Sequence, residues 1–472
     1  MAIIKPQNAK GTRDFGPIES SRRNHIFETI KKRFQSHGFM PLETPAVENL
    51  NVLTGKYGEE GDKLLFRVLN SGDFLKKVKP EDLEEKNLSA VSSKMCDRGL
   101  RYDLTIPFAR YVCANLNELA LPFKRYQIQP VWRADRPQKG RYREFYQCDG
   151  DIIGTESLLS EVSLVEVYHD VFKDLKIDGV EIVINNRKIL QGIASVLGVS
   201  DKLTDMTVAI DKLDKIGAEK VGEELLGRGF NEDQVSRLST LLTLEGDSDK
   251  KLSTIREFLG ADEIGKLGLE ELEFVLSNVR ELGIENLVFD PTLARGLDYY
   301  TGCIFEVKLV DGSMGSIGGG GRYDDLTSMF GQKEKLSGVG ISFGAERIYD
   351  VMLDRGLFDD SVSNIDYLIT NIDSNYTLEY LKLAKELRDK GNRVEIYPTT
   401  AKLKKQLNFA NKKGVKCVVF YGEEEKQNNT IKFKGMRTGK QYILSRNELP
   451  DISIIEKHEN TFDESECEPI IE

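Results

Sequence analysis

Apolar residues in the middle of the chain recur at the spacing of one helix face. Between residues 186 and 284 they follow positions i, i+3 and i+4, in a segment rich in Leu, Glu and Lys. The segment contains neither a glycine-rich loop nor an aromatic cluster. We therefore predict a helical insertion domain over 186–284. Its clearest apolar positions are Leu238, Leu241, Leu242, Leu269, Leu272, Val275 and Leu276.

Apolar runs and helix-like stretches alternate in the C-terminal part of the chain. Strands are expected at 367–370, 393–397 and 417–421, and helices at 377–390 and 402–413. Alternation of this kind favours a small α/β domain with parallel strand pairing, which we place at 364–450.

The N-terminal part of the chain, 1–185, has a different pattern. It opens with turn-forming residues at 10–17, continues through a helix-like stretch that ends near Phe34, and then contains strand-like apolar runs. Clusters of Gly, Pro, Asp and Asn mark further boundaries. The resulting segments are 1–185, 186–284, 285–357, 364–450 and a tail, 451–472.

Composition narrows the class of protein. A length of 472 residues suffices for about three domains and a large core. With 40% hydrophobic and 30% charged residues, the chain has the balance of an ordinary globular protein. No apolar run approaches the roughly 20 residues of a membrane span, and the first residues lack the apolar region of a secretory signal. We expect a cytoplasmic protein without membrane contact.

Cysteine and histidine usage limits the chemistry. The six cysteines, from Cys96 to Cys467, form no CxxC pair, so we expect reduced thiols and no structural zinc. The four histidines show neither HExxH nor HxxxH spacing. Catalysis by a His base, a His-ligated metal or any metal site made of protein ligands alone is therefore not expected.

Charge is unevenly distributed along the chain. Residues 364–450 contain 17 Lys and Arg against 10 Asp and Glu, a net +7, within a protein of net charge −11. The tail, 451–472, contains 8 acids and one Lys, a net −7. A basic module on an acidic protein indicates either a locally contacted polyanion or lysine-rich faces that only solvate the domain.

Arginines concentrate in a segment that reads as a hairpin. Two strand-like flanks enclose a Pro-Gln-Lys-Gly turn, which brings charged and aromatic side chains together. A guanidinium group binds phosphate oxygens in pairs, and a flat Phe can stack on a purine ring. The hairpin favours a nucleoside triphosphate site, with a solvated basic hairpin as the alternative. Its residues of interest are Arg133, Arg141, Arg143, Phe145 and Gln147.

Two glycine-rich segments are also candidates for a binding site. The segment 338–348 reads as a strand followed by a helix with Arg347 near its start, a favourable place for phosphate, or as glycines that serve close packing. It matches neither GxGxxG nor a P-loop. The segment 315–326 contains four consecutive glycines and is either a floor for a small substrate or a flexible loop.

Two short segments combine charged and hydroxyl side chains. Asp103 and Thr105 lie on one face of an expected extended segment, which suits an ammonium group, although a turn-forming pair is the more common explanation. Arg295, Tyr299 and Tyr300 precede an expected strand at 304–307. They offer a cation for a carboxylate or phosphate and a phenol for a polar ring.

In this order, the segments resemble the histidyl-tRNA synthetases, a family of class II aminoacyl-tRNA synthetases, over nearly the whole chain. Lys-Gly-Thr-Arg-Asp-Phe at 10–15 resembles the family's first segment, and Gly-Phe-Met-Pro-Leu-Glu-Thr-Pro at 38–45 resembles motif 1. The arginine hairpin resembles motif 2, and the strand-to-helix segment resembles motif 3. Arg-Tyr-Asp-Leu-Thr at 101–105 and Arg-Gly-Leu-Asp-Tyr-Tyr-Thr-Gly at 295–302 resemble the patterns of the histidine enzyme.

The resemblance implies a mixed α/β (α+β) fold. A class II catalytic domain on an antiparallel sheet would span 1–185 and 285–357, interrupted by the helical insertion and followed by an anticodon-binding domain at 364–450. The implied activity is ATP-dependent activation of L-histidine to histidyl-adenylate, with Mg²⁺, and transfer to the 3′ end of tRNA(His). The subunits would form a homodimer through motif 1. The acidic tail has no family role that we can assign.

The resemblance also implies roles for the basic residues. Arg133 and Arg295 would clamp the α-phosphate and the substrate carboxylate. Arg347 would hold the γ-phosphate with Arg141 and Mg²⁺, while Phe145 stacks on adenine. These groups would stabilise charge during an in-line attack that needs no protein nucleophile.

Residues that match the family's histidine pocket would select the substrate by hydrogen bonds. They are Asp103, Thr105 and Gln147 for the α-amino group, Asp151 and Tyr300 for the imidazole, and Tyr299 beside them. Some family members carry Glu at the two acidic positions, so the contacts of Asp103 and Asp151 follow a different subtype.

Residues outside the pocket would contact tRNA. Gln138 in the motif 2 loop would approach the acceptor end, and Lys402, Lys404 and Lys405 would contact phosphates. The alternative is a non-catalytic regulatory paralogue that partners a phosphoribosyltransferase of histidine biosynthesis. That paralogue lacks the anticodon domain, and its Arg and Tyr motifs are usually degraded, whereas this chain keeps both. A generic nucleic-acid-binding protein would explain the basic segment but not the glycine run.

Overall fold

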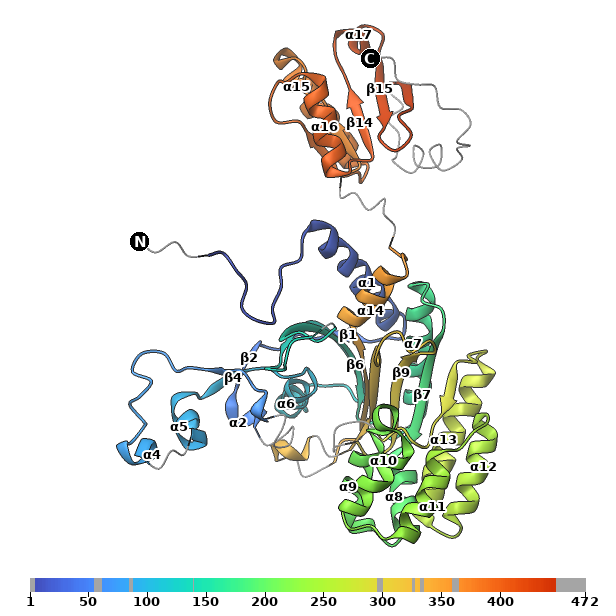
Figure 1. Ribbon diagram of the computed structural model, residues 1–472. Coiled ribbons are helices and arrows are strands. Elements are labelled where there is room, and N and C mark those ends of the chain that lie inside the picture. The colour runs from blue at the N-terminus through green and yellow to red at the C-terminus, as the bar shows by residue number, and fades with distance from the viewer. Residues whose placement is uncertain are drawn as a thin grey trace. The chain divides into compact units, whose positions relative to one another are not determined.

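The structure, a computed structural model, describes residues 5–54, 62–84, 88–138, 140–294, 300–324, 327–331, 335–358 and 365–446. Its contacts divide the chain into two compact units (Figure 1). One consists of Met1–Asp14 and Arg22–Leu357, and the other of Phe15–Ser21 and Phe358–Glu472. Within the described ranges, no helix has the length and apolar character needed to cross a membrane.

An eight-stranded sheet forms the centre of the larger unit. Its strands are β1 (Met40–Pro41), β5 (Phe123–Trp132), β6 (Glu144–Ile153), β7 (Val180–Asn186), β8 (Leu287–Phe289), β9 (Cys303–Leu309), β10 (Gly318–Tyr323) and β11 (Gly338–Gly344). The order is β1-β5-β6-β11-β10-β9-β7-β8. All pairs from β5 to β7 are antiparallel, and the edge pairs β1–β5 and β7–β8 are parallel. The prediction of an antiparallel sheet is confirmed.

Two long helices, α1 (Pro17–Ser36) and α7 (Leu159–Asp174), pack on the same apolar ring of the sheet. Phe34 of α1 and Phe172 of α7 both contact Phe343 of β11, with ring centroids 5.9 and 5.8 Å apart. A Cβ at Gly150 of β6 would lie 2.1 Å from the Phe34 ring, so this close approach requires glycine. Because side chains alternate across a strand, the residues between these apolar positions face the opposite side of the sheet. β11 leads directly into α14 (Ala345–Asp354).

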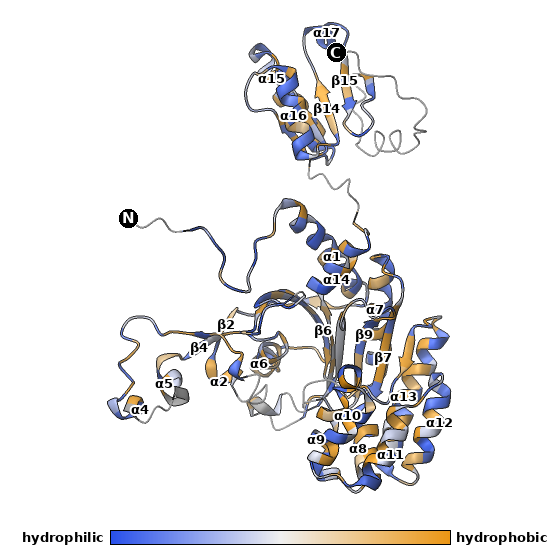
Figure 2. Ribbon diagram, viewed as in Figure 1, coloured by the Kyte–Doolittle hydropathy of each residue, from blue (hydrophilic) through white to orange (hydrophobic). Residues whose placement is uncertain are grey.

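Between β7 and β8 the chain is helical. The elements are α8 (Arg187–Val196), the 3₁₀ helix η1 (Ser200–Lys202), α9 (Leu203–Ile210), α10 (Leu213–Gly227), α11 (Glu232–Leu242), α12 (Ser248–Leu259) and α13 (Glu263–Glu281). Asn231, Asp247 and Asp262 each accept a backbone N–H of the first turn and so begin α11, α12 and α13. The seven apolar positions named from the sequence are buried. Figure 2 shows apolar and polar faces on these helices, and α13 packs on α7, α8 and β7 within the larger unit.

A three-stranded antiparallel sheet, β2 (Val47–Asn49), β4 (Arg98–Leu100) and β3 (Arg67–Val68), lies in the larger unit. Further helices of that unit are α2 (Leu50–Leu53), α4 (Pro80–Glu84), α5 (Leu88–Met95), α6 (Thr105–Asn115) and the 3₁₀ helix η2 (Ser328–Phe330). The expectation of an extended segment through Asp103 and Thr105 is wrong, because Thr105 is the first residue of α6. The Asp103 carboxylate accepts the N–H of Ile106 at 3.1 Å and thereby supports the start of the helix.

The smaller unit contains a five-stranded sheet with helices. Its elements are β12 (Tyr367–Ile369), the 3₁₀ helix η3 (Ser374–Tyr376), α15 (Thr377–Asp389), β13 (Val394–Ile396), α16 (Leu403–Lys413), β14 (Cys417–Phe420), α17 (Glu423–Gln427), β15 (Thr430–Gly435) and β16 (Gln441–Ser445). The strand order is β13-β12-β14-β15-β16. Pairing is parallel around β12, as expected, whereas β15 and β16 add an antiparallel hairpin that the sequence analysis did not predict.

Candidate active site

Alternate residues of β6 form the base of the site. Gln147, Asp149 and Asp151 share one face of the strand, because side chains alternate. They pair across β11 with residues that carry little or no side chain, which leaves space above them. These partners are Gly344, Ser342 and Gly340.

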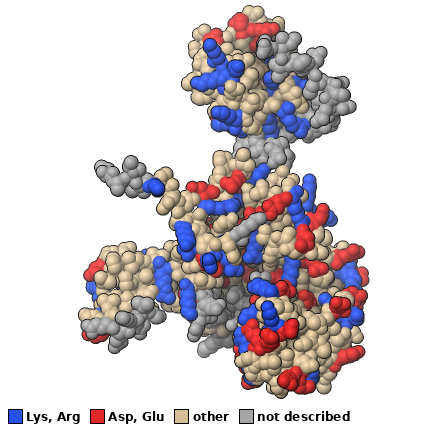
Figure 3. All heavy atoms as spheres, in the orientation of Figure 1, with Lys and Arg blue, Asp and Glu red and all other residues tan. Residues whose placement is uncertain are grey.

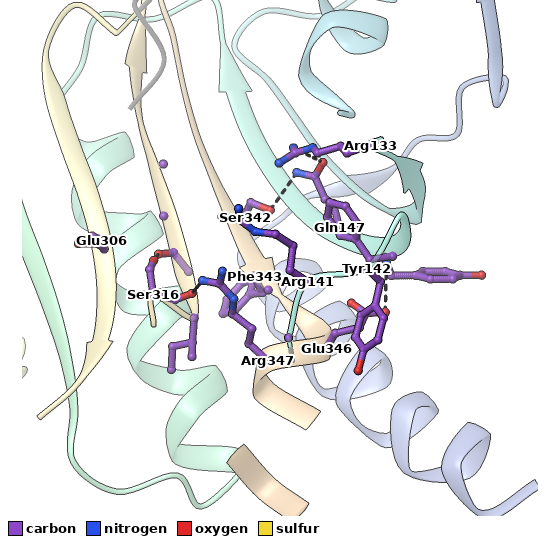
Figure 4. A pocket seen from close by; sticks show the side chains of 18 of the residues that line it. Arg133, Arg141, Tyr142, Gln147, Glu306, Ser316, Ser342, Phe343, Glu346 and Arg347 are labelled. Atoms are coloured by element: carbon purple, nitrogen blue, oxygen red, sulfur yellow. Dashed lines mark hydrogen bonds between the residues drawn. The ribbon is translucent and has the colours of Figure 1, made fainter. Parts of the chain in front are cut away.

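A cavity of about 510 Å³ lies over this part of the sheet (Figure 4). Arg133 and Arg141 reach it from the hairpin between β5 and β6, and Arg347 reaches it from the first turn of α14. Phe145 also lines the cavity, with the Arg133 guanidinium carbon 5.2 Å from its ring centre. Three guanidinium groups around one cavity suit the phosphates of a nucleoside triphosphate, and the aromatic ring suits its base.

A second cavity, of about 100 Å³, adjoins the first and shares Arg133, Gln147 and Tyr300 with it. Its other side chains are mostly acidic or hydroxylated, and each of its three carboxylate residues is only 3% exposed. Buried carboxylates of this kind suit a ligand that brings its own N–H donors, such as an ammonium group. These acidic and hydroxylated side chains include Asp103, Thr105, Asp149, Asp151 and Tyr323.

Asp151 is held by two partners. Arg125 Nη2 lies 2.6 Å from Asp151 Oδ2, and the Tyr323 hydroxyl donates to Asp151 Oδ1 at 2.8 Å. Burial raises the pKa of Asp151 above its ordinary value, and the Arg125 charge and the Tyr323 hydrogen bond oppose that rise. Arg125 is fully buried, so the two charges compensate each other inside the protein.

Asp149 is a second buried carboxylate of the small cavity, with a pKa far from its ordinary value. Burial raises the pKa of Asp149 to about 7, and the carboxylates of Asp151 and Asp103 add to this rise. The Arg125 charge and a hydrogen bond from Ser342 act in the opposite direction. A carboxyl group that titrates near neutral pH in a cavity is typical of functional sites.

Arg133 connects the two cavities. Its Nε donates to the carbonyl of Tyr102 at 3.0 Å, and its Nη2 donates to Gln147 Oε1 at 3.3 Å. Its guanidinium carbon lies 4.2 Å from the centre of the Tyr102 ring. The side chain is therefore positioned before any ligand arrives.

The four consecutive glycines form part of a strand. They belong to β10, and Gly318, Gly319 and Gly320 line the larger cavity. A Cβ at Gly320 would lie 2.1 Å from the Gly340 carbonyl oxygen, so the neighbouring backbone leaves no room for a side chain. The sequence left two interpretations of this glycine segment. The interpretation as a surface that supports a small substrate agrees with this arrangement, and the interpretation as a flexible loop does not.

Several residues named from the sequence lie elsewhere. Arg295 and Tyr299 lie outside the described residues. Gln138 forms an isolated bridge with Arg141 and lines neither cavity, and Arg143 donates to the carbonyl of Asp135 at 3.1 Å. The three lysines of the smaller unit that were named from the sequence are exposed around the start of α16: Lys402, Lys404 and Lys405.

The structure adds residues that the sequence analysis missed. Asp149, Ser342 and Tyr323 line the small cavity, and Arg125 neutralises Asp151. Strand alternation from Gln147 was a usable signal for Asp149. The sequence contained no comparable signal for Tyr323 and Arg125, because the residues that they contact are remote in sequence.

Among the described residues, no group of three His, Cys, Asp or Glu side chains is arranged to hold a metal ion. Glu306, Asp135 and Glu346 line the larger cavity, and the Glu306 carboxylate lies 3.2 Å from Lys308 Nζ. A divalent ion in this cavity would therefore draw most of its ligands from a bound phosphate group.

An antiparallel sheet with an arginine hairpin, and with a further arginine at the strand-to-helix junction, defines a class II aminoacyl-tRNA synthetase. The family model described as histidyl-tRNA synthetase matches residues 73–348, and the anticodon binding domain model matches residues 366–457. The chain belongs to the histidyl-tRNA synthetase family.

Individual relatives agree with this assignment. The chain is 52% identical over 442 residues to a histidine–tRNA ligase of Porphyromonas gingivalis, with 93% of this chain and 97% of the relative covered. It is 50% identical over 447 residues to a histidine–tRNA ligase of Phocaeicola vulgatus, covering 94% and 98%. The histidyl-tRNA synthetase crystal structure from Nostoc sp. PCC 7120 superposes with a TM-score of 0.83 at 30% identity, covering 97% of this chain and 100% of the other.

Proposed function

We propose that this protein is a histidine–tRNA ligase, which activates L-histidine with ATP and transfers it to the 3′ end of tRNA(His). The observation that carries the proposal is the pair of adjoining cavities, one cationic and aromatic, the other acidic, joined at Arg133 and Gln147. Relatives of the same name align over nearly the full length, and an anticodon-binding domain is present. The regulatory paralogue is therefore not favoured.

The reaction has two steps. The carboxylate of histidine attacks the α-phosphorus of ATP, the bond to the β-phosphate oxygen breaks, and pyrophosphate leaves. A ribose hydroxyl at the 3′ end of the tRNA then attacks the acyl carbon of histidyl-adenylate, loses its proton, and displaces AMP. Both steps depend on positioning and charge stabilisation rather than on a protein nucleophile.

The larger cavity would hold ATP. Arg133 lies where the two cavities meet, so it would contact the α-phosphate and the attacking carboxylate together, with Arg295 as a second cation. Arg347 and Arg141 would bind the outer phosphates, and Phe145 would stack on the adenine ring. Arginine suits these positions because its charge and its paired donors are retained at any physiological pH.

The smaller cavity would hold the amino acid. Its volume of about 100 Å³ restricts it to a small group. Asp103, Thr105 and Gln147 would bind the α-amino group. Asp151 and Tyr300 would bind the two imidazole nitrogens, with Tyr299 nearby. A competitor without those nitrogens would leave buried polar groups unpaired, which gives selectivity without an editing domain.

Mg²⁺ would accompany ATP. Bound to the phosphates, the ion would neutralise the charge that develops on the leaving pyrophosphate. Glu306, at the wall of the larger cavity, is the residue we would assign to its protein contact.

The smaller unit would bind the anticodon end of the tRNA. Figure 3 shows Lys and Arg side chains gathered on its visible face and acidic side chains near α17. Lys402, Lys404 and Lys405 cluster at the start of α16, where backbone N–H groups also favour anions. Gln138, exposed in the hairpin loop, would contact the acceptor end.

The domains would divide the work of catalysis and tRNA binding, and two subunits would assemble. The catalytic domain would consist of 1–185 and 285–357, with the helical insertion between them and the anticodon domain at 364–450. A homodimer would form around motif 1, where β1 is an edge strand and Met40 is 61% exposed. We place the protein in the cytoplasm, with its tRNA substrate.

ATP–pyrophosphate exchange with purified protein, Mg²⁺ and each of the twenty amino acids tests the activity. We expect exchange with histidine alone, a loss of about a hundredfold or more in Arg133→Ala, and no loss in Arg136→Ala, an exposed arginine of the same loop that lines neither cavity. Protein that shows no exchange with histidine but still binds tRNA or a partner enzyme would support the regulatory paralogue instead.

A further inference from the structure

The side-chain amide of Gln147 is fixed from three directions. Its Nε2 donates to Asp149 Oδ1 and to Ser342 Oγ, each at 3.4 Å. Its Oε1 accepts from Arg133 Nη2 at 3.3 Å. Two of these contacts, to Arg133 and Ser342, are drawn in Figure 4.

The chemistry of these partners decides which end of the amide points where. An ionised carboxylate only accepts hydrogen bonds, so Asp149 requires the amino end of Gln147. A guanidinium group only donates, so Arg133 requires the oxygen. A carbonyl oxygen has a second lone pair, which in this orientation stays available for a cationic donor in the cavities that Gln147 lines.

We propose that Asp149 is a positioning residue for the α-amino group of the substrate, because it holds the Gln147 amide with its oxygen turned toward that group. The inference rests on the proposed function and adds a residue to it. In a reversed amide, the amino end would meet Arg133 and the substrate ammonium, and both would repel it. Ser342 assists, although a hydroxyl accepts or donates and therefore selects the orientation less strongly.

The charge state of Asp149 controls how strictly the amide is oriented. Protonated Asp149 can donate as well as accept, so the preference for one orientation weakens as the pH falls below its pKa of about 7. A bound ammonium ion favours the ionised form. Among the described residues, the charged and titratable groups around Asp149 are Arg125 on β5, Asp151 on its own strand, Asp103 before α6, Tyr168 on α7, and Arg133, Tyr300 and Tyr323 at the cavity wall.

The variant Asp149→Asn tests this role, because asparagine has the same shape but accepts either end of the amide. We expect KM for histidine in ATP–pyrophosphate exchange to rise about tenfold or more, with a smaller change in kcat. In the unmodified protein, kcat/KM for histidine should increase as the pH rises through about 7, and this increase should be smaller in the variant by the part that Asp149 contributes. Titration of the substrate imidazole is common to both proteins.

Two inhibitors separate the α-amino group from the rest of the substrate. Histidinol keeps the amine, whereas 3-(imidazol-4-yl)propionate lacks it. We expect Asp149→Asn to weaken inhibition by histidinol about tenfold and to leave inhibition by imidazolylpropionate within about twofold. Equal weakening of both inhibitors would overturn the proposal, since it would indicate general damage to the cavity.

Matched variants complete the test. Glu144→Gln makes the same change on the same strand at an exposed residue that lines neither cavity, and it should not alter KM. Ser342→Ala should raise KM for histidine less than Asp149→Asn does, and it tests the same amide if the aspartate variant does not fold. Unchanged KM and pH profile in Asp149→Asn, with normal exchange in the unmodified protein, would refute the inference alone. Absence of exchange in the unmodified protein would refute the proposed function.

Discussion

Asp151 occupies the space that a side chain at position 340 would need. The two residues pair across β6 and β11, and a Cβ at Gly340 would lie 2.0 Å from Asp151 Oδ1. Arg125 and Tyr323 hold the two oxygens of Asp151, so the carboxylate cannot move without losing a partner. Gly340 is therefore part of the substrate pocket, although it contributes no functional group.

The first prediction concerns this glycine. Gly340→Ala should displace the Asp151 carboxylate, raise KM for histidine at least tenfold, and destabilise the protein by about 1–3 kcal/mol through overpacking. Exchange kinetics and thermal unfolding measure both effects. Gly227→Ala, at a glycine with open space around it, is the control and should change neither. A normal KM in Gly340→Ala would mean that the carboxylate adjusts freely.

Arg347 should act on ATP and not on histidine. Arg347→Ala removes a cation that reaches the larger cavity beside Ser316, and we expect KM for ATP to rise about tenfold or more while KM for histidine changes little. Arg355→Ala removes a half-buried arginine that is paired with Asp311 and lines neither cavity, and it serves as the control. Equal effects of the two substitutions would show that only surface charge matters.

The ion pair between Glu161 and Arg322 should contribute mainly to stability. Arg322 Nη2 donates to Glu161 Oε2 at 2.7 Å, and the two side chains are 6% and 0% exposed. Arg322 also donates to the Thr155 carbonyl and to the Ser337 hydroxyl, which ties β10 to its surroundings. Glu161→Ala should lower the free energy of unfolding by about 3–5 kcal/mol, because it leaves a buried guanidinium without its carboxylate. Denaturant unfolding measures this loss, and a change below about 1 kcal/mol would contradict it.

The lysines of α16 should affect tRNA alone. Lys404→Ala combined with Lys405→Ala should raise KM for tRNA(His) several-fold in aminoacylation, weaken the salt dependence of tRNA binding, and leave ATP–pyrophosphate exchange unchanged. Lys382→Ala combined with Lys385→Ala, on α15 in the same unit, is the charge-matched control, since Lys382 is paired with Glu379 and Lys385 with Asp389. A parallel loss of exchange would indicate a folding defect and not a tRNA contact.

The buried carboxyl of Asp149 should make stability depend on pH. Its pKa is about 7 in the folded protein, compared with the ordinary value of 3.8. The folded state thus retains a proton that the unfolded chain has released, and this contribution to stability, which is complete below about pH 4, is lost as the pH rises through about 7. The full shift corresponds to about 4 kcal/mol. Asp149→Asn cannot titrate, so its melting temperature relative to the unmodified protein should be higher at pH 8 than at pH 5. An equal difference at both pH values would argue against the raised pKa.

The local pattern of apolar and polar residues was sufficient to predict secondary structure where a segment's own residues decide its conformation. The strand and helix positions predicted between 367 and 421 agree with β12, α15, β13, α16 and β14 to within a few residues. The segment through Asp103 was mispredicted, since its carboxylate accepts the Ile106 N–H and a helix begins where alternation suggested an extended chain. The hairpin of β15 and β16 was also missed, although residues 430–435 alternate between buried and half-buried positions.

The sequence by itself determined the order of the motifs, the helical middle segment and the residues that could bind phosphate and an amine. The tertiary structure decided that four glycines of low strand propensity form β10, where Gly320 lies so close to the Gly340 backbone that no Cβ would fit. The tertiary structure also decided the pKa of Asp149, which depends on burial and on Arg125, Asp103 and Ser342. The fold brings these residues together from distant positions in the sequence. Periodicity is a local property that can be read along the chain, whereas burial and charge proximity exist only once remote segments have packed.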